Sequence, residues 1–145
     1  MTIAGREVLL VKPQTYMNLS GEAVRPIVTA HKFDPSKLIL IHDDLDLAEG
    51  RVRIKIGGGH GGHKGVASVA DCLDSENFIR VRLGIGRPPA GVDPTEFVLT
   101  AFEPDDEQSK KNLIQDGLQA VRLIVRDGLE RAQNVIHSKN KTSIP

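Results

Sequence analysis

Three short polar segments in the first half of the chain hold most of the side chains that could do chemistry. They are residues 15–21, 42–47 and 57–65. The second segment places a histidine beside three carboxylates, and the third carries two histidines and a lysine among six glycines. Imidazoles and carboxylates exchange protons near neutral pH, and glycine lets a phosphate or carbonyl group approach the backbone closely. The sequence therefore predicts a site for proton transfer and anion binding.

The acidic segment contains one carboxylate with a distinctive position. Asp43 comes soon after the apolar run 38–41, and a carboxylate at the end of a buried strand commonly orients a histidine by accepting its N–H. Two other interpretations stay open. In one, Asp44 and Asp46 cap a turn before Gly50. In the other, a metal ion is held by a set drawn from His42, Asp43, Asp44, Asp46, His60 and His63, although no single element carries these at a diagnostic spacing.

The glycine segment satisfies a dinucleotide fingerprint only formally, through Gly57, Gly59 and Gly62. The run before it is half basic, and no acidic residue ends the next strand to hold a ribose hydroxyl. A P-loop is excluded because Lys64 is followed by glycine instead of the hydroxyl residue that would hold Mg²⁺. What remains is an anion site in which His60, His63 and Lys64 add donors to the free N–H groups of the following helix.

Basic residues alternate with apolar ones in two strand-like runs. Arg51, Arg53 and Lys55 lie in the first run, and Arg80 and Arg82 lie in the second. If the two strands are neighbours, their basic faces form one positive strip that could clamp phosphates. The competing interpretation is an ordinary solvated strand face.

The elements that would position these groups follow from periodicity. Buried strands are expected at residues 8–11 and 38–41, and amphipathic strands at 52–56 and 78–85. Helices are expected from an N-cap at Ser20 with a kink or true start at Pro26, and over residues 65–73, 105–126 and 129–137, with a loop over 86–94. This order predicts a single α/β domain over residues 1–145, a three-layer sandwich with helices on both sides of a sheet.

Composition narrows the class of protein. The 145-residue chain has a formal net charge of zero, one cysteine and no run of about 18 apolar residues, so we expect a soluble cytoplasmic protein without disulfides or a membrane anchor. Aromatic residues make up only 3%, with no tryptophan, which argues against recognition of nucleic acid by base stacking.

Taken together, the three segments resemble those of bacterial peptidyl-tRNA hydrolase, in order and approximate spacing. The resemblance rests on residues 12–21, 42–47 and 57–65, and extends over the strand at 78–86 and the C-terminal helices. It implies a mixed β-sheet flanked by helices, a monomer, and no metal or cofactor. It also implies that water attacks the ester of peptidyl-tRNA, which releases peptide and tRNA.

The resemblance also implies roles for individual residues. Tyr16, Met17 and Asn18 would bind the peptide or acyl end, His63 and Lys64 would line the substrate groove, and Asp43 would orient the catalytic histidine. The residues expected to contact tRNA phosphates are Arg53, Lys55 and Arg82.

Two departures from the family pattern lead to further expectations. Lys64 stands where the family usually has asparagine, and nothing in the chain corresponds to the family's first strand and helix, which bear its catalytic histidine. We therefore expect an exposed sheet edge or an uncovered apolar core, and little hydrolase activity in this chain. The alternative is a catalytically silent RNA-binding relative.

Overall fold

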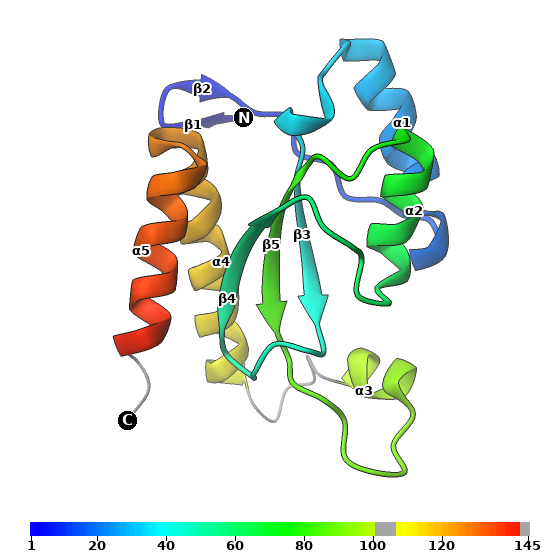
Figure 1. Cartoon of the computed structure of the whole chain (residues 1–145), viewed down its shortest axis with the longest axis vertical. Coiled ribbons are helices and arrows are strands. Elements are labelled where there is room, and N and C mark those ends of the chain that lie inside the picture. The colour runs from blue at the N-terminus through cyan, green and yellow to red at the C-terminus, as the bar shows by residue number, and fades with distance from the viewer. Residues whose placement is uncertain (101–106, 143–145) are drawn as a thin grey trace. The chain divides into compact units, whose positions relative to one another are not determined.

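The computed structural model describes residues 1–100 and 107–142, which form a mixed α/β protein (Figure 1). One sheet has the strand order β3-β5-β4, and a separate hairpin pairs β1 with β2. The strands are β1 (Thr2–Ile3), β2 (Arg6–Glu7), β3 (Ile39–Asp44), β4 (Val52–Ile56) and β5 (Ile79–Gly84). The helices are α1 (Ser20–His31), α2 (Lys64–Leu73), α3 (Pro94–Thr100), α4 (Glu107–Asp127) and α5 (Leu129–Thr142), with the 3-10 turns η1 (Met17–Leu19) and η2 (Pro35–Lys37). The expected α/β class is confirmed.

The chain divides into two compact units. The first comprises Met1–Leu40 and Lys55–Arg80, and the second comprises Ile41–Ile54 and Val81–Pro145. Strands β3, β4 and β5 each contribute residues to both units. The three-layer arrangement, the single domain and the lack of a first strand and helix stay predictions.

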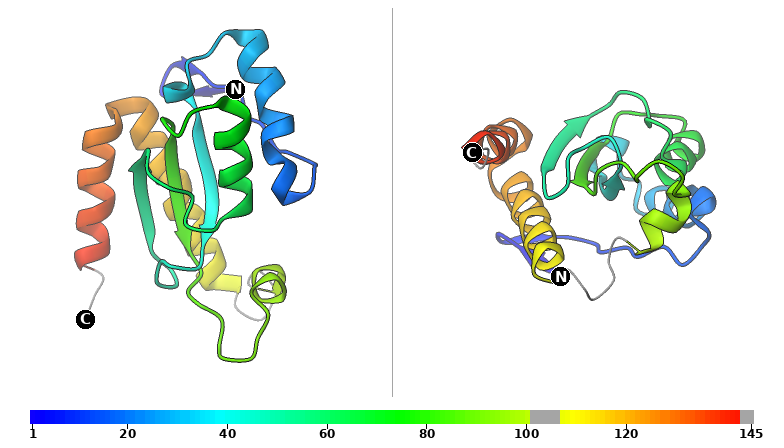
Figure 2. Two further views of the ribbon diagram at one scale, coloured as in Figure 1. Left: turned by 45° about the vertical axis from the view of Figure 1, so that its right-hand side comes forward. Right: turned by 90° about the horizontal axis from the view of Figure 1, so that it is seen from below.

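The first unit is built around a close crossing of α1 and α2, which lie side by side in Figure 2. Its buried core consists of Val24, Val66, Val69 and Phe78. A Cβ at Gly21 would lie 2.2 Å from the carbonyl oxygen of Ser68, so only glycine allows the two helices to approach this closely. The Gly21 N–H donates to Ser68 Oγ at 2.9 Å, which fixes the register of the crossing.

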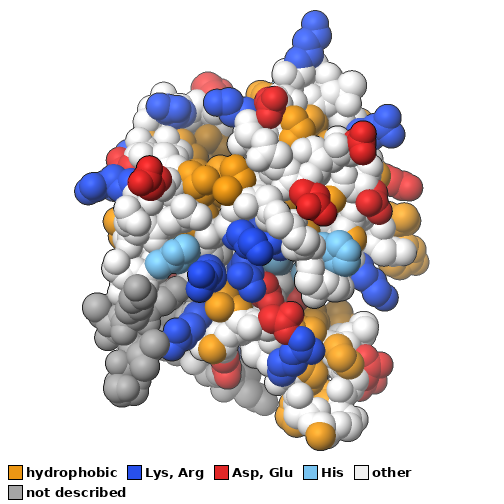
Figure 3. All heavy atoms as spheres, viewed as in Figure 1, with side chains coloured by type: hydrophobic (Ala, Val, Ile, Leu, Met, Phe, Trp, Pro, Cys, Tyr) orange, Lys and Arg blue, Asp and Glu red, His pale blue; other side chains and the backbone are white. Residues whose placement is uncertain are grey.

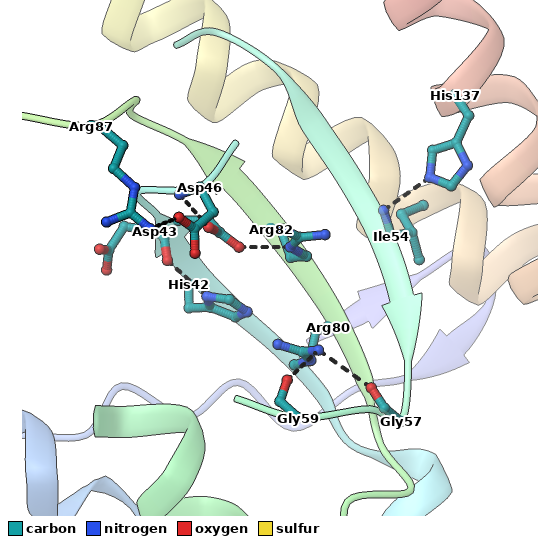
Figure 4. Close-up of polar contacts among 11 residues, drawn as sticks. His42, Asp43, Asp46, Ile54, Gly57, Gly59, Arg80, Arg82, Arg87 and His137 are labelled. Carbon is teal, nitrogen blue, oxygen red and sulfur yellow. Dashed lines mark hydrogen bonds and ion pairs between the residues drawn. The ribbon is translucent and has the colours of Figure 1, made fainter. Parts of the chain in front are cut away.

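In the second unit, α4 and α5 pack against the sheet strands. A Cβ at Gly117 in α4 would lie 2.9 Å from Leu83 of β5. Helix α5 covers the edge strand β4. The Ile54 N–H donates to His137 Nε2 at 3.2 Å (Figure 4), and Gln133 Nε2 donates to the carbonyl of Ile54, also at 3.2 Å. These two bonds satisfy backbone groups that an edge strand otherwise leaves unpaired.

The connection between β3 and β4 is fastened to the end of β5 at Gly84. The Gly84 N–H donates to the backbone carbonyl of Arg51 at 2.7 Å, and the Gly84 carbonyl accepts from the N–H of Gly50 at 3.0 Å. A Cβ at Gly84 would lie 2.2 Å from the carbonyl oxygen of Ala48. The acidic turn over residues 44–51 is therefore held against β5 by the backbone itself.

The expected buried strand at residues 8–11 is wrong. These residues form no strand, and Leu9 and Leu10 are 52% and 75% exposed. Backbone pairing ends with the hairpin β1–β2, where Met1 and Val8 exchange two hydrogen bonds. The turn of this hairpin uses positive φ angles at Ala4 and Gly5, as a two-residue hairpin requires. A short apolar run makes a strand only when a neighbour pairs with it.

Several other boundaries differ from the expected ones. Ser20 is the first residue of α1, not its N-cap, because its Oγ donates to the carbonyl of Met17 at 2.7 Å; Pro26 lies inside this helix. Strand β3 continues through residues 42–44, where the Ile85 N–H donates to the Asp44 carbonyl at 3.1 Å. Helix α3 was not predicted, α5 extends beyond residue 137, and residue 105, the expected start of α4, lies outside the described residues.

Candidate functional site

The first and third sequence segments come together in the first unit. A Cβ at Gly65 would lie 2.6 Å from Met17 Sδ and 3.0 Å from His63 Cε1, so η1 lies against the start of α2. Tyr16 and Met17 are 81% and 54% exposed there, and Asn18 is exposed as well. Ser20 and Gly21, which close the same segment, tie α1 to η1 and α2. The packing thus places Met17 next to His63 at the start of α2, with Tyr16 and Asn18 exposed on the same segment.

His63 is the N-cap of α2, a role that the sequence did not suggest. Its Nδ1 accepts from the N–H groups of Gly65 and Val66 at 3.1 and 3.2 Å. The expectation that these N–H groups are free for an anion is therefore wrong for these two residues. Because Nδ1 accepts, the neutral ring carries its proton on Nε2. His63 therefore offers a hydrogen-bond donor at Nε2, and Lys64, the first residue of α2, is exposed next to it.

Arg80 is buried, whereas the sequence placed it on an exposed basic face. Its side chain donates to the carbonyl oxygens of Gly57 and Gly59 at 3.3 and 3.0 Å (Figure 4), and the residue is 4% exposed. The reason is the place of β5 beside β4, which brings the Arg80 side chain against the glycine loop that follows β4. Alternation in one strand gives no information about which strand is central, and so the role of Arg80 was missed.

The positive strip is shorter than expected. Strands β4 and β5 are neighbours, as the sequence analysis required. Arg53 and Lys55 of β4 are exposed, and Figure 3 shows Lys and Arg side chains gathered over this strand. Arg82, however, is largely covered and its Nε donates to Asp44 Oδ2 at 2.6 Å. The strip is therefore interrupted at both β5 positions, and its exposed part is on β4.

Asp44 has the structural role that the sequence analysis left open. Its Oδ1 accepts from the Asp46 N–H at 2.8 Å, which closes the turn after β3. Burial raises the pKa of Asp44, but the hydrogen bonds from Arg82 and from the Asp46 backbone outweigh it, so the pKa lies below its ordinary value. Asp46 forms a second ion pair with Arg87, which is exposed.

Asp43 lies inside β3 and is half-buried. The neighbouring His42 is buried, and its Nδ1 donates to the Asp43 carbonyl at 2.8 Å (Figure 4). The role of Asp43 as an orienting carboxylate stays a prediction. Within residues 1–100 and 107–142, no group of three or more His, Cys, Asp or Glu is placed to hold a metal ion. No helix in the same described ranges is long and apolar enough to cross a bilayer.

Comparison with known proteins bears on these observations. The sequence model of the peptidyl-tRNA hydrolase family matches residues 1–143, which does not support the expectation of a missing first segment. The chain is 43% identical over 136 residues to the peptidyl-tRNA hydrolase of Mycolicibacterium smegmatis and 45% identical over 135 residues to that of Mycobacterium tuberculosis. The matches cover 94% and 93% of this chain and 71% of each relative.

Solved structures agree with the sequence relatives. A variant of peptidyl-tRNA hydrolase from Acinetobacter baumannii superposes with a TM-score of 0.77 at 33% identity, covering 93% of this chain and 68% of that one. A second structure of the enzyme from the same organism gives 0.71 at 31% identity, with coverages of 86% and 63%. The match to this second structure therefore covers less than two thirds of that chain's length. Since the family match takes in nearly every residue, the chain belongs to the peptidyl-tRNA hydrolase family.

Proposed function

We propose that this protein hydrolyses the ester bond that joins a peptide to tRNA. The observation that carries the proposal is the packing of η1 against α2, which places Met17 next to Gly65 and His63 at the start of α2, while Tyr16 and Asn18 are exposed on the same segment. Such a surface suits an acyl group: exposed Met17 offers apolar contact, and the Asn18 amide both donates and accepts. A protein acting on peptidyl-tRNA would work in the cytoplasm, where translation takes place.

Ester hydrolysis needs a base that activates water and donors that stabilise the oxyanion formed on the carbonyl. His63 is suited to donation, because its Nδ1 is used in capping α2. Asp43 is proposed to orient the imidazole of the general base by accepting its N–H, which fixes the tautomer and stabilises the imidazolium.

The tRNA would be held through its phosphates by Arg53, Lys55 and Lys64, which are exposed, and by Arg82. Arg82 reaches a phosphate only through the guanidinium N–H groups that Asp44 does not use, or by leaving Asp44. Its contribution to binding should therefore be smaller than that of Lys55.

The proposal is tested with N-acetyl-aminoacyl-tRNA as substrate, by measuring release of the acyl group. We expect turnover by the chain, because the family model matches from residue 1; this replaces the expectation of little activity. We also expect a raised KM in Asn18→Ala and a kcat about 10²- to 10⁴-fold lower in Asp43→Asn. Lys55→Ala is the matched control. It should weaken binding of uncharged tRNA and reduce the log–log salt slope by about 0.7 to 0.9, whereas Asn18→Ala leaves that slope unchanged.

The rate of the unaltered chain also locates the base. A rate typical of the family assigns the base to one of the chain's own histidines, His42, His60 or His63, although His63 could accept a proton only by giving up its cap on α2. Tight tRNA binding without any turnover would refute the hydrolase and favour an RNA-binding relative that has lost catalysis.

A further inference from the structure

The glycine-rich loop after β4 is held from inside by one buried cation. Arg80 donates to the carbonyl oxygens of Gly57 and Gly59, two residues apart, at 3.3 and 3.0 Å (Figure 4). The residue is 4% exposed, although the loop residues 58–62 are themselves exposed. An arginine is rarely buried to this degree unless the partners of its guanidinium are fixed.

The loop needs such support. Gly57 and Gly58 have φ angles of +67° and +77°, and Gly61 and Gly62 have +60° and +85°. Glycine loses more conformational freedom on ordering than any other residue, so a run of these residues has no strong preference of its own. Beyond the loop, the chain enters the His63 cap of α2. Two bonds from one rigid guanidinium select a single loop conformation between two fixed ends.

Lys55 lies against the same loop. A Cβ at Gly58 would lie 2.9 Å from Lys55 Nζ and 3.9 Å from the Arg80 guanidinium, so the Gly58 Cα faces both an exposed cation and a buried one. The Lys55 ammonium is carried on a flexible side chain, so it can still reach a phosphate when the loop backbone moves.

We propose that Arg80 is a positioning residue for the substrate: it does not touch the tRNA, but holds the loop 57–59 in the conformation that the tRNA binds. The identity of the ligand, tRNA, rests on the proposed function, whereas the claim that Arg80 holds the loop does not depend on that function. Loss of Arg80 should therefore weaken substrate binding without slowing the chemical step.

The experiment compares Arg80→Met, Arg80→Lys and the control Lys55→Met, all in the whole chain. Arg80→Met should raise KM for N-acetyl-aminoacyl-tRNA about tenfold and leave kcat within about twofold. Hydrogen exchange of the backbone over residues 57–62 should become faster. Arg80→Lys, which can reach one carbonyl, should give an intermediate KM and intermediate exchange. Lys55→Met should reduce the salt slope of tRNA binding, and Arg80→Met should not.

A double-variant cycle separates positioning from direct contact. Gly57→Ala loosens the same loop because alanine disfavours the positive φ, while its Cβ has room and the Arg80 and Lys55 side chains stay in place. If Arg80 acts through the loop, the effects of Gly57→Ala and Arg80→Met on KM should overlap and not add. Additive effects, unchanged exchange in Arg80→Met, or a salt slope reduced by about 0.7 to 0.9 would each overturn the proposal.

Two further outcomes remain interpretable. If Arg80→Met does not fold, Arg80→Lys is compared with Gly57→Ala, and the same overlap of effects on KM is expected at smaller size. If the unaltered chain neither binds nor hydrolyses the substrate, the proposed function fails, and the exchange data still decide whether Arg80 holds the loop.

Discussion

Replacing Asp44 by asparagine should make the protein less stable and at the same time a tighter tRNA binder. The side chains of Arg82 and Asp44 are only 18% and 14% exposed, and their Nε and Oδ2 atoms are 2.6 Å apart. Asparagine has almost the same shape and can still accept the Asp46 N–H with its oxygen. The substitution therefore removes the charge that holds Arg82 and keeps the turn after β3.

The size of the effect follows from the burial of the pair. Exposed ion pairs contribute about 0–1 kcal/mol, and breaking one partner of a buried pair costs about 3–5 kcal/mol. A pair that is mostly covered should lie between these limits, at about 2 kcal/mol, which corresponds to a Tm lower by about 6 °C for a chain of this size. Releasing Arg82 toward a phosphate should tighten tRNA binding about fivefold, equivalent to about 1 kcal/mol.

The pH dependence of the Tm gives an independent check on the contribution of the Asp44–Arg82 ion pair to stability. Because the pKa of folded Asp44 lies below its ordinary value of 3.8, its stabilising effect is present above that value and is lost as the pH falls through the folded pKa. The Tm difference between the protein and Asp44→Asn should therefore be constant near neutral pH and shrink below about pH 4.

The assay is thermal unfolding together with tRNA binding at several salt concentrations. Asp46→Asn is the matched control, since its ion pair with Arg87 is exposed, with side chains 72% and 45% accessible, and should contribute less than about 1 kcal/mol. A loss of stability in Asp44→Asn with no gain in affinity would show that Arg82 does not contact tRNA and that the pair serves the fold alone.

Two other substitutions test the fold and the start of α2. Gly84→Ala should lower the Tm by about 10 °C or more, because the new Cβ would lie 2.2 Å from the Ala48 carbonyl oxygen. This shift corresponds to a loss of about 3 kcal/mol or more in the free energy of unfolding. A Tm within a few degrees of the parent would contradict the close approach. Lys64→Asn should raise stability by about 0.3–1 kcal/mol, since it removes a positive charge from the N-terminal end of a helix, and should also weaken tRNA binding. Equal tRNA affinity at every salt concentration would exclude Lys64 as a phosphate contact.

The elements with complete periodic patterns were predictable from the sequence. Val52 and Ile54 alternate with basic residues and are both buried in β4, and the apolar positions of residues 65–73 form the buried side of α2. In contrast, residues 8–11 are four apolar residues in a row, which fits a strand only if a partner is present. The sequence contains no direct information on that partner.

The site was predictable in its residues and less so in their roles. Met17 and His63 lie close to each other around Gly65, because Gly21 and Ser68 fix the crossing of α1 and α2, whereas the roles of residues 16–18 stay predictions. The cap made by His63 was missed since histidine is uncommon among N-cap residues. The positions of Arg80 and Arg82 depend on strand order, a property of tertiary structure that alternation along one strand does not encode.

The cover that α5 places over β4 has a consequence for self-association. An uncovered strand edge is a template for pairing with another chain, and the only protection that the described residues give Ile54 is two side chains on a terminal helix. His137 accepts with Nε2, so this half of the cover exists only while that nitrogen carries no proton. Fraying of α5, or protonation of His137 Nε2, would thus leave backbone groups of the β4 edge open to pairing with a strand of another chain.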